Sequence, residues 1–142
     1  MDTRQIELVQ QTFARAARLG PHVAATFYSE LFLIDPSLRR MFSGDMVRQG
    51  QQLMATLNYI VGGISDPESV LPAARELAVR HVGYGVEARH YVMVGTALMR
   101  TFKHELGRDF TPEAHAAWTS AYTLLSDAMC EAAYGHTNAP AR

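Results

Sequence analysis

Apolar residues recur every three or four positions along almost the whole chain, which is the spacing of one face of an α-helix. The first stripe consists of Ile6, Val9, Phe13 and Ala17. Breaks between stripes coincide with glycines and with proline-containing pairs, which end and start helices. No run reads convincingly as a strand and no segment repeats. The pattern therefore predicts an all-α fold class.

Start and stop signals divide the chain into helical segments of unequal length. Asp2 caps the first with Gln5 as its capping-box partner, and the Thr111-Pro112 pair opens the last. The expected segments are one ending at Gly20, one from 21 to before 35, then 37–41, about 46–61, 67 to 83 or 85, 87–106, and 112 to about 134. These seven or so helices favour an irregular packing over a four-helix bundle, whose helices would be of similar length.

Composition and charge exclude several classes of function. The 142 residues have room for one domain, and 48% of them are hydrophobic, as in ordinary globular proteins. The net charge of −1 gives no general attraction to nucleic acid or to an anionic membrane, so neither is an expected partner. Cys130 is the single cysteine, which excludes an internal disulfide framework and a multi-cysteine metal site.

The two ends of the chain carry no recognised signal. Residues 1–5 are polar and lack the apolar core of a signal peptide, and the apolar runs elsewhere are too short to span a bilayer. We therefore expect a cytoplasmic protein. The polar stretch 137–142 is expected to be a disordered tail behind a domain that covers residues 1–136.

His81 is the most informative single residue. It lies late in a predicted helix, just before Gly83 and Gly85. A neutral imidazole held there can ligate the iron of a flat macrocycle. Taken alone, the position fits a surface or core histidine better. The remaining histidines have no such context and are expected to face solvent: His22, His90, His104, His115 and His136.

Three segments resemble the single-domain bacterial globins related to the globin part of flavohaemoglobins. They are 26–32 (TFYSELF), 36–42 (PSLRRMF) and 80–86 (RHVGYGV), and the likeness covers nearly the whole chain. It implies a globin fold of about seven helices around a pocket for haem b. Arg80-His81 followed by Gly85-Val86 matches the proximal signature of that family, which makes His81 the expected iron ligand.

The resemblance also implies the distal side of the pocket. Tyr28 matches the distal tyrosine, Phe42 the phenylalanine that stacks on the haem ring, and Gln49 the distal gate. Leu53 follows Gln49 by one helical turn and should face the same cavity, with Leu57 extending that wall. Without the resemblance, an aromatic pair such as Phe27-Tyr28 would be interpreted as core packing.

On the proximal side the chain departs from the flavohaemoglobin pattern. Tyr91 matches a tyrosine that helps a glutamate polarise the proximal imidazole, but the position of that glutamate is Ala133. Glu131, two residues away, should face a different side of its helix. A backbone carbonyl is therefore expected to orient the second nitrogen of His81. Arg80 is a candidate partner for a haem propionate, although an ordinary exposed arginine explains it equally well.

Four further residues are expected to complete the lining of the haem pocket, although ordinary packing in the core explains their apolar character equally well. They are Val86, Tyr91, Val94 and Leu98.

The resemblance implies a protein that binds oxygen reversibly and tightly, as a carrier, store or scavenger. Its gas ligands would be oxygen, nitric oxide and carbon monoxide. A second hypothesis is oxidation of nitric oxide to nitrate; because the chain has no dinucleotide-binding fingerprint, this would need a separate reductase. A gas sensor and a haem-free interaction domain are further alternatives. The sequence leaves monomer and homodimer open.

Overall fold

The computed structural model describes residues 1–135, which form six α-helices and three short 3₁₀ helices. The α-helices are α1 (Thr3–Leu19), α2 (His22–Ile34), α3 (Met46–Gly62), α4 (Leu71–Gly83), α5 (Ala88–Leu106) and α6 (Pro112–Tyr134). The 3₁₀ helices are η1 (Pro36–Met41), η2 (Pro67–Ser69) and η3 (Gly107–Asp109). The expected boundary at 136 and the expected tail 137–142 lie outside the described residues.

The seven segments expected from the sequence are all helical. Asp2 and Gln5 form the reciprocal capping box at the start of α1, and the Thr111 side chain accepts a hydrogen bond from the N–H of Ala114 at the start of α6. Two segments differ in detail. The segment at 37–41 is the 3₁₀ helix η1, and the segment from 67 is broken into η2 and α4, with Pro72 in the first turn of α4. The all-α prediction is confirmed.

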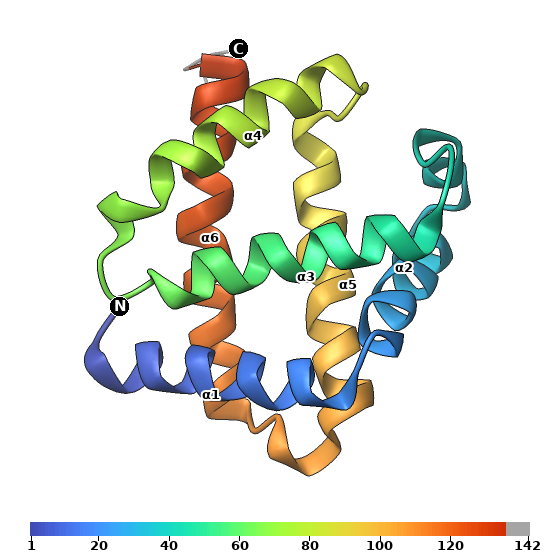
Figure 1. The fold of residues 1–142 in the computed structure, drawn as a ribbon. Coiled ribbons are helices and arrows are strands. Elements are labelled where there is room, and N and C mark those ends of the chain that lie inside the picture. Colours follow the sequence, from blue (N-terminus) through green and yellow to red (C-terminus); the bar gives the residue numbers. More distant parts are fainter. Residues whose placement is uncertain (136–142) are drawn as a thin grey trace.

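Helices α5 and α6 run side by side, and α1, α3 and α4 cross them in the view of Figure 1. Helix α2 packs mainly on α5, α1 packs on α6, and α4 packs on α6. Helix α3 rests on α1 and α2. Mixed lengths and crossing directions make this the irregular packing that the sequence predicted. No helix within residues 1–135 is long and apolar enough to cross a membrane.

The core is divided into two clusters of buried side chains. The larger one joins α1, α2, α5 and α6, with Val9, Phe102 and Trp118 among its members. The smaller one ties α4 to α5 and α6 through Ala74, Ala78, Tyr91, Met129 and Cys130. Burying a large apolar side chain contributes roughly 1.5–3 kcal/mol, so the small residues of α4 give that helix closer approach but less stabilisation.

Two glycines allow close helix contacts. A methyl group at Gly50 on α3 would lie 2.9 Å from the Cβ of Ala24 on α2, and one at Gly95 on α5 would lie 2.7 Å from the ring of Tyr122 on α6. Both distances are shorter than carbon atoms tolerate, so each crossing depends on the missing side chain. The contact at Gly50 fixes the separation of the two helices that carry Tyr28 and Gln49.

Candidate functional site

The expected proximal side of the site lies on the last turns of α4. His81 is half-buried there, and its Nδ1 lies 2.8 Å from the backbone carbonyl oxygen of Leu77. An oxygen acceptor at this distance requires Nδ1 to carry the proton and donate it. The lone pair of the imidazole is then on Nε2. The ring is oriented by a carbonyl of its own helix, which is the kind of partner that the sequence predicted.

The chain after His81 folds back on the end of α4. The N–H groups of Tyr84 and Val86 both donate to the carbonyl oxygen of His81, at 3.0 and 3.1 Å. Gly85 has a φ of +88°, a conformation that glycine adopts without strain. The hydroxyl of Tyr134 on α6 donates to the carbonyl oxygen of Val86 at 2.6 Å. The Gly85-Val86 turn is therefore held both to its own helix and to α6.

Tyr28, the expected distal tyrosine, lies inside an aromatic cluster. Tyr28 is 8% exposed, and its ring centroid lies 5.1 Å from that of Phe27, 5.3 Å from that of Phe42 and 6.2 Å from that of Phe32. Burial raises the pKa of Tyr28 to about 12. The hydroxyl is therefore a proton donor throughout the neutral pH range.

The hydroxyl of Tyr28 donates to the backbone carbonyl oxygen of Gln49 at 3.3 Å. This is a long hydrogen bond, and it involves the main chain of Gln49 instead of its amide side chain. The structure thus brings Tyr28 and Gln49 together through the α2–α3 crossing at Gly50. The half-buried Gln49 side chain has no hydrogen bond within the described residues.

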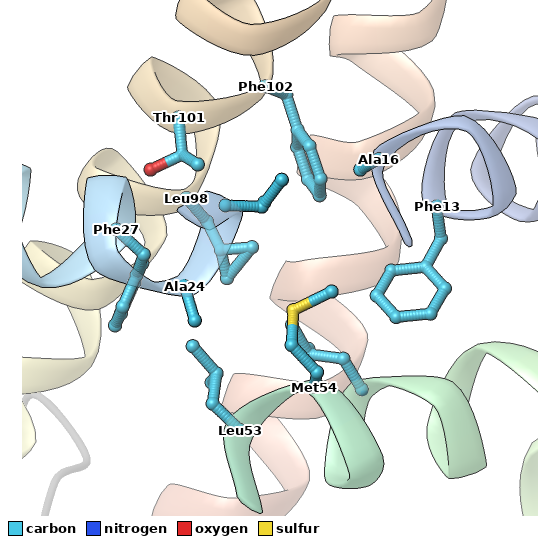
Figure 2. A pocket seen from close by; sticks show the side chains of 11 residues that line it. Phe13, Ala16, Ala24, Phe27, Leu53, Met54, Leu98, Thr101 and Phe102 are labelled. Atoms are coloured by element: carbon cyan, nitrogen blue, oxygen red, sulfur yellow. The ribbon is translucent and has the colours of Figure 1, made fainter. Parts of the chain in front are cut away.

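Leu53 and Leu57 lie one helical turn apart on α3, but Gln49 does not line the cavity that they share, so their predicted place in one pocket with Gln49 stays a prediction. Both leucines are half-buried, and with Phe27 and Leu98 they line a small cavity of about 10 Å³ between α1, α2, α3 and α5 (Figure 2). The one polar side chain in this wall, Thr101, donates its hydroxyl to the carbonyl oxygen of Ala97 at 2.7 Å. The wall of the cavity is therefore almost wholly apolar.

Comparison with known proteins fits this arrangement of helices and side chains. The family model described as Globin matches residues 25–129, which include α3 to α5 and most of α2 and α6. The chain belongs to the globin family. The resemblance stated from the three sequence segments is thereby confirmed.

This globin is homologous to the globin domains of flavohemoproteins. The flavohemoprotein of Bacillus cereus is 29% identical over 132 residues, which are 91% of this chain and 32% of that protein. That of Bordetella parapertussis is 33% identical over 125 residues, 86% of this chain and 31% of that protein. The chain spans about a third of the length of these curated relatives.

Two solved structures share the fold of this globin over nearly its whole length. One is an engineered carbene transferase from Rhodothermus marinus, a protein provisionally assigned as a nitric oxide dioxygenase. It has a TM-score of 0.84 at 25% identity and covers 100% of this chain and 99% of that one. The other is a bacterial globin from Campylobacter jejuni, with a TM-score of 0.81 at 22% identity over 93% and 96% of the two chains.

The donor set of this globin fits a haem. One imidazole has its Nε2 lone pair available, and the chain also carries half-buried apolar side chains at the positions expected to line a haem: Phe42, Leu53, Leu57, Val86 and Val94. Residues 1–135 contain no group of three or more His, Cys, Asp and Glu that would hold a metal ion directly. A metal bound through a macrocycle and a single protein ligand needs no such group.

Arg80, the candidate propionate partner, is exposed on α4 and forms no ion pair with any described residue. The structure therefore brings it near His81 only along the helix.

Two links that stabilise the site could not be predicted from the sequence. They are the Tyr134 hydroxyl on Val86 and the Tyr122 hydroxyl on the carbonyl oxygen of Tyr91, which join residues 48 and 31 positions apart.

Tyr91 of this globin has a buried hydroxyl with no hydrogen-bond partner within the described structure. Its surroundings explain this. Ala133, at the position where the flavohaemoglobin pattern has a glutamate, is one of the small apolar residues packed against the cluster of Tyr91, and Glu131 is exposed, as expected for a different helix face. Burial and the nearby Tyr134 and Cys130 raise the pKa of Tyr91 to about 12, so the unpaired group is a neutral phenol.

Replacing Tyr91 with phenylalanine should raise the free energy of unfolding by about 1 kcal/mol. The substitution keeps the ring in the core and removes a hydroxyl whose unpaired burial costs about 1–3 kcal/mol. Urea unfolding of Tyr91→Phe against the parent measures the change. Tyr122→Phe is the matched control and should lower stability by about 1 kcal/mol, because its hydroxyl donates at 2.5 Å to the backbone of Tyr91. Equal destabilisation by both variants would contradict the account.

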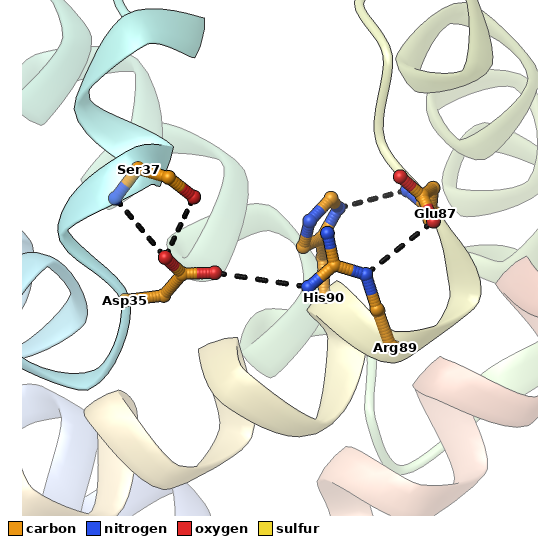
Figure 3. Close-up of polar contacts among 5 residues, drawn as sticks. All are labelled: Asp35, Ser37, Glu87, Arg89 and His90. Atoms are coloured by element: carbon orange, nitrogen blue, oxygen red, sulfur yellow. Dashed lines mark hydrogen bonds and ion pairs between the residues drawn. The ribbon is translucent and has the colours of Figure 1, made fainter.

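His90 is 4% exposed, so its expected solvent-facing position is wrong. Its ring turns back over the first turn of α5, where Nδ1 accepts the N–H of Glu87 at 2.9 Å as half of a capping box (Figure 3). Arg89 beside it bridges Glu87 and Asp35, the latter at 3.7 Å. His22, His104 and His115 are exposed, as predicted, and His136 lies outside the described residues.

The same network joins the start of α5 to the turn after α2. Asp35 accepts hydrogen bonds from the hydroxyl and the N–H of Ser37, at 2.6 and 3.0 Å, and these bonds together with the Arg89 charge lower the pKa of Asp35 (Figure 3). The carboxylate is therefore charged at neutral pH. It ties η1, which leads to Phe42, to the segment that follows Val86.

Proposed function

We propose that this globin binds a b-type haem through Nε2 of His81 and holds oxygen reversibly on the opposite face. The observation that carries the proposal is the hydrogen bond from Nδ1 of His81 to the Leu77 carbonyl, because it leaves Nε2 as the free lone pair. Ferrous haem, when bound, supplies the open coordination position for a diatomic gas. Membership of the globin family supports the same cofactor.

Each side chain then has a defined task. Phe42, Leu53, Leu57, Val86, Tyr91 and Val94 would line the haem and exclude water, and Arg80 would pair with a propionate. Tyr28 would donate its hydroxyl proton to the gas ligand, with the Gln49 amide as a second donor at the pocket entrance. Because the existing bond of Tyr28 to the Gln49 backbone is long, at 3.3 Å, transferring that donor to the ligand costs little.

Tight binding follows from the charge on the ligand. A gas ligand that gains negative charge when bound would accept a hydrogen bond from Tyr28, and a hydrogen bond to a charged group contributes about 1.5–3 kcal/mol. Since about 1.4 kcal/mol is a factor of ten, this one donor slows oxygen release by roughly ten- to a hundredfold. Carbon monoxide takes less charge and gains less. The protein would therefore suit scavenging or storage better than delivery.

The first test is the ultraviolet–visible spectrum of the purified protein, recorded as isolated, after reduction, and after exposure to oxygen. A Soret band that shifts at each step is the expected result. No Soret band, even after addition of haem, would refute the proposal and favour a haem-free interaction domain.

Nitric oxide dioxygenation is the second candidate function. It is favoured by the homology to flavohemoproteins and by the likeness to the Rhodothermus marinus protein. Turnover would draw electrons from a reductase separate from these 142 residues. Repeated addition of nitric oxide in the presence of oxygen, NADH and a generic flavin reductase should yield nitrate in excess of haem. Nitrate limited to one equivalent per haem would leave oxygen binding as the function.

A further inference from the structure

The outer faces of α5 and α6 contain two long runs without a charged residue. Residues 90–99 of α5 and 114–126 of α6 include no Asp, Glu, Lys or Arg, although these types make up 19% of the chain. Val92, in the first run, is 72% exposed. Further exposed residues of the two runs include Thr96, Ala116, Thr119 and Thr123. Surfaces at which proteins associate are depleted of charge at their centre in the same way.

Charged residues flank these runs, and their sign differs between the two helices. The exposed ones on α5 are all basic: Arg89, Arg100 and Lys103. Those on α6 are all acidic: Glu113, Asp127 and Glu131. The single acidic residue of α5, Glu105, turns toward α2, where its carboxylate accepts a hydrogen bond from the hydroxyl of Thr26 at 2.6 Å. The two helices therefore form one positive and one negative edge of a common surface.

Contacts between the helices fix how these edges align. The two helices run antiparallel, and α1, α3 and α4 cross one side of the pair (Figure 1). The ring centroids of Phe102 and Trp118 lie 4.6 Å apart. Further along the pair, Gly95 lies against the ring of Tyr122. These two contacts set which turn of α5 is level with which turn of α6.

This register places opposite charges side by side at both ends of the surface. Lys103 follows Phe102 directly and is level with the first turn of α6, which carries Glu113. At the other end, Arg89 is level with the turn of Asp127. Each end thus has a cation on α5 and an anion on α6, and the uncharged runs lie between the ends.

We propose that this surface binds a second copy of the same chain, forming a two-fold dimer in which α5 of each copy packs on α6 of the other. A two-fold axis parallel to the helices brings Lys103 onto Glu113 of the second copy. The same axis brings Arg89 onto Asp127 of the second copy, and symmetry makes each pair occur twice. An axis across the helices would instead bring α5 onto α5, with basic residues facing basic ones. Charge therefore selects the first arrangement, and the uncharged runs meet at its centre.

The same charged groups have contacts within one chain that a second copy would share. Glu113 forms an exposed ion pair with Arg4 at 3.1 Å, and Arg89 lies 3.7 Å from Asp35. Exposed pairs of this kind are weak, so they leave both groups able to meet a further charge.

The size of the surface sets the strength of the dimer. The 19 residues of α5, at about 1.5 Å each, span about 28 Å, and two packed helices are about 20 Å wide. Two copies would together bury about 1,100 Å², close to the lower limit of about 1,000 Å² for specific interfaces. We therefore expect a dimer that dissociates on dilution in the micromolar range.

The first test is sedimentation velocity of the purified full-length protein from low micromolar to millimolar concentration. The mass should rise from the 15.7 kDa of one chain toward twice that value. Val92→Arg should stay monomeric throughout, because each copy then brings an unpaired charge to the centre of the contact. Thr123→Arg does the same from α6 and is the second variant. Val79→Arg is the matched control: Val79 is 56% exposed on α4, outside the surface, and this variant should dimerise like the parent.

A charge exchange tests the orientation of the two copies. Lys103→Glu should weaken the dimer roughly tenfold, because it places two acidic residues opposite each other and the contact occurs twice. Glu113→Lys should weaken the dimer to a similar extent. The double variant Lys103→Glu/Glu113→Lys should recover most of the parent affinity. Arg75→Glu, at an exposed position of α4, is the control and should leave the affinity unchanged.

The proposal fails if the parent remains a monomer at millimolar concentration. It fails equally if Val92→Arg and Thr123→Arg, both shown to be folded by circular dichroism, dimerise like the parent. A dimer that is lost in Val79→Arg and kept in Val92→Arg would place the contact on α4. A double variant weaker than either single charge variant would exclude the pairing of α5 with α6.

Discussion

Replacing His81 with alanine should lower the affinity for haem by more than about 100-fold. Losing only an outer-shell partner of a ligand costs about 10–100-fold in metal affinity, and here the ligand itself is removed. Haem titration followed at the Soret band measures the loss. Added imidazole should restore the spectrum of a ligated haem. The alanine leaves a gap where the His81 ring was, and the Leu77 carbonyl oxygen that accepted its proton is still there for the free imidazole.

His104→Ala is the control for this experiment. His104 is exposed in the last turn of α5 and should bind haem as the parent does after substitution. The Soret and circular dichroism spectra of His81→Ala distinguish two ways in which the prediction could fail. An unchanged Soret band and affinity would show that another residue ligates the iron, whereas loss of helical circular dichroism would show that α4 needs the histidine to fold.

Replacing Tyr28 with phenylalanine should speed oxygen dissociation roughly ten- to a hundredfold and change carbon monoxide dissociation far less. The variant removes one hydroxyl donor and keeps the ring that packs on Phe27, Phe32 and Phe42. Stopped-flow displacement of oxygen by carbon monoxide gives the rate. An unchanged oxygen rate would exclude Tyr28 as the donor.

The pH dependence of that rate provides a further check on Tyr28. Its pKa of about 12 keeps the hydroxyl protonated, so the parent rate should be flat between about pH 6 and pH 9 as far as this group is concerned. Tyr59→Phe is the matched control, since Tyr59 is an exposed tyrosine on α3. It should alter neither the rate nor its pH profile.

The sequence predicted the helices well because their ends are encoded locally. Asp2 with Gln5, and Thr111 with Pro112, are caps that act within a few residues of each other. The 3₁₀ form of η1 was not predicted, since a short segment after Asp35-Pro36 can close its hydrogen bonds in either pattern. The burial of His90 was missed for a different reason: a histidine at the third position of a helix is an unusual capping-box partner.

The candidate site was predicted only in part from single residues. His81, Tyr28 and Gln49 stand out by their spacing, yet the contacts between them come from tertiary packing. That Tyr28 donates to the main chain of Gln49, and that Tyr134 fastens the turn at Val86, depends on how α2 meets α3 and α6 meets α4. No local pattern encodes such distances, so the roles of these residues await the substitutions described above.

In the proposed function, the missing side chain of Gly50 links release of the gas to the packing of α3 on α2. A side chain there would collide with Ala24, which lies 2.9 Å from the position of a Cβ, and would lift α3 away from α2. The neighbouring carbonyl of Gln49 would move with it, leaving the Tyr28 hydroxyl to seek another acceptor. Oxygen kinetics could then change although every group that meets the gas keeps its identity. Searches for variants with slower or faster oxygen release should therefore include residues at helix crossings as well as residues of the pocket wall.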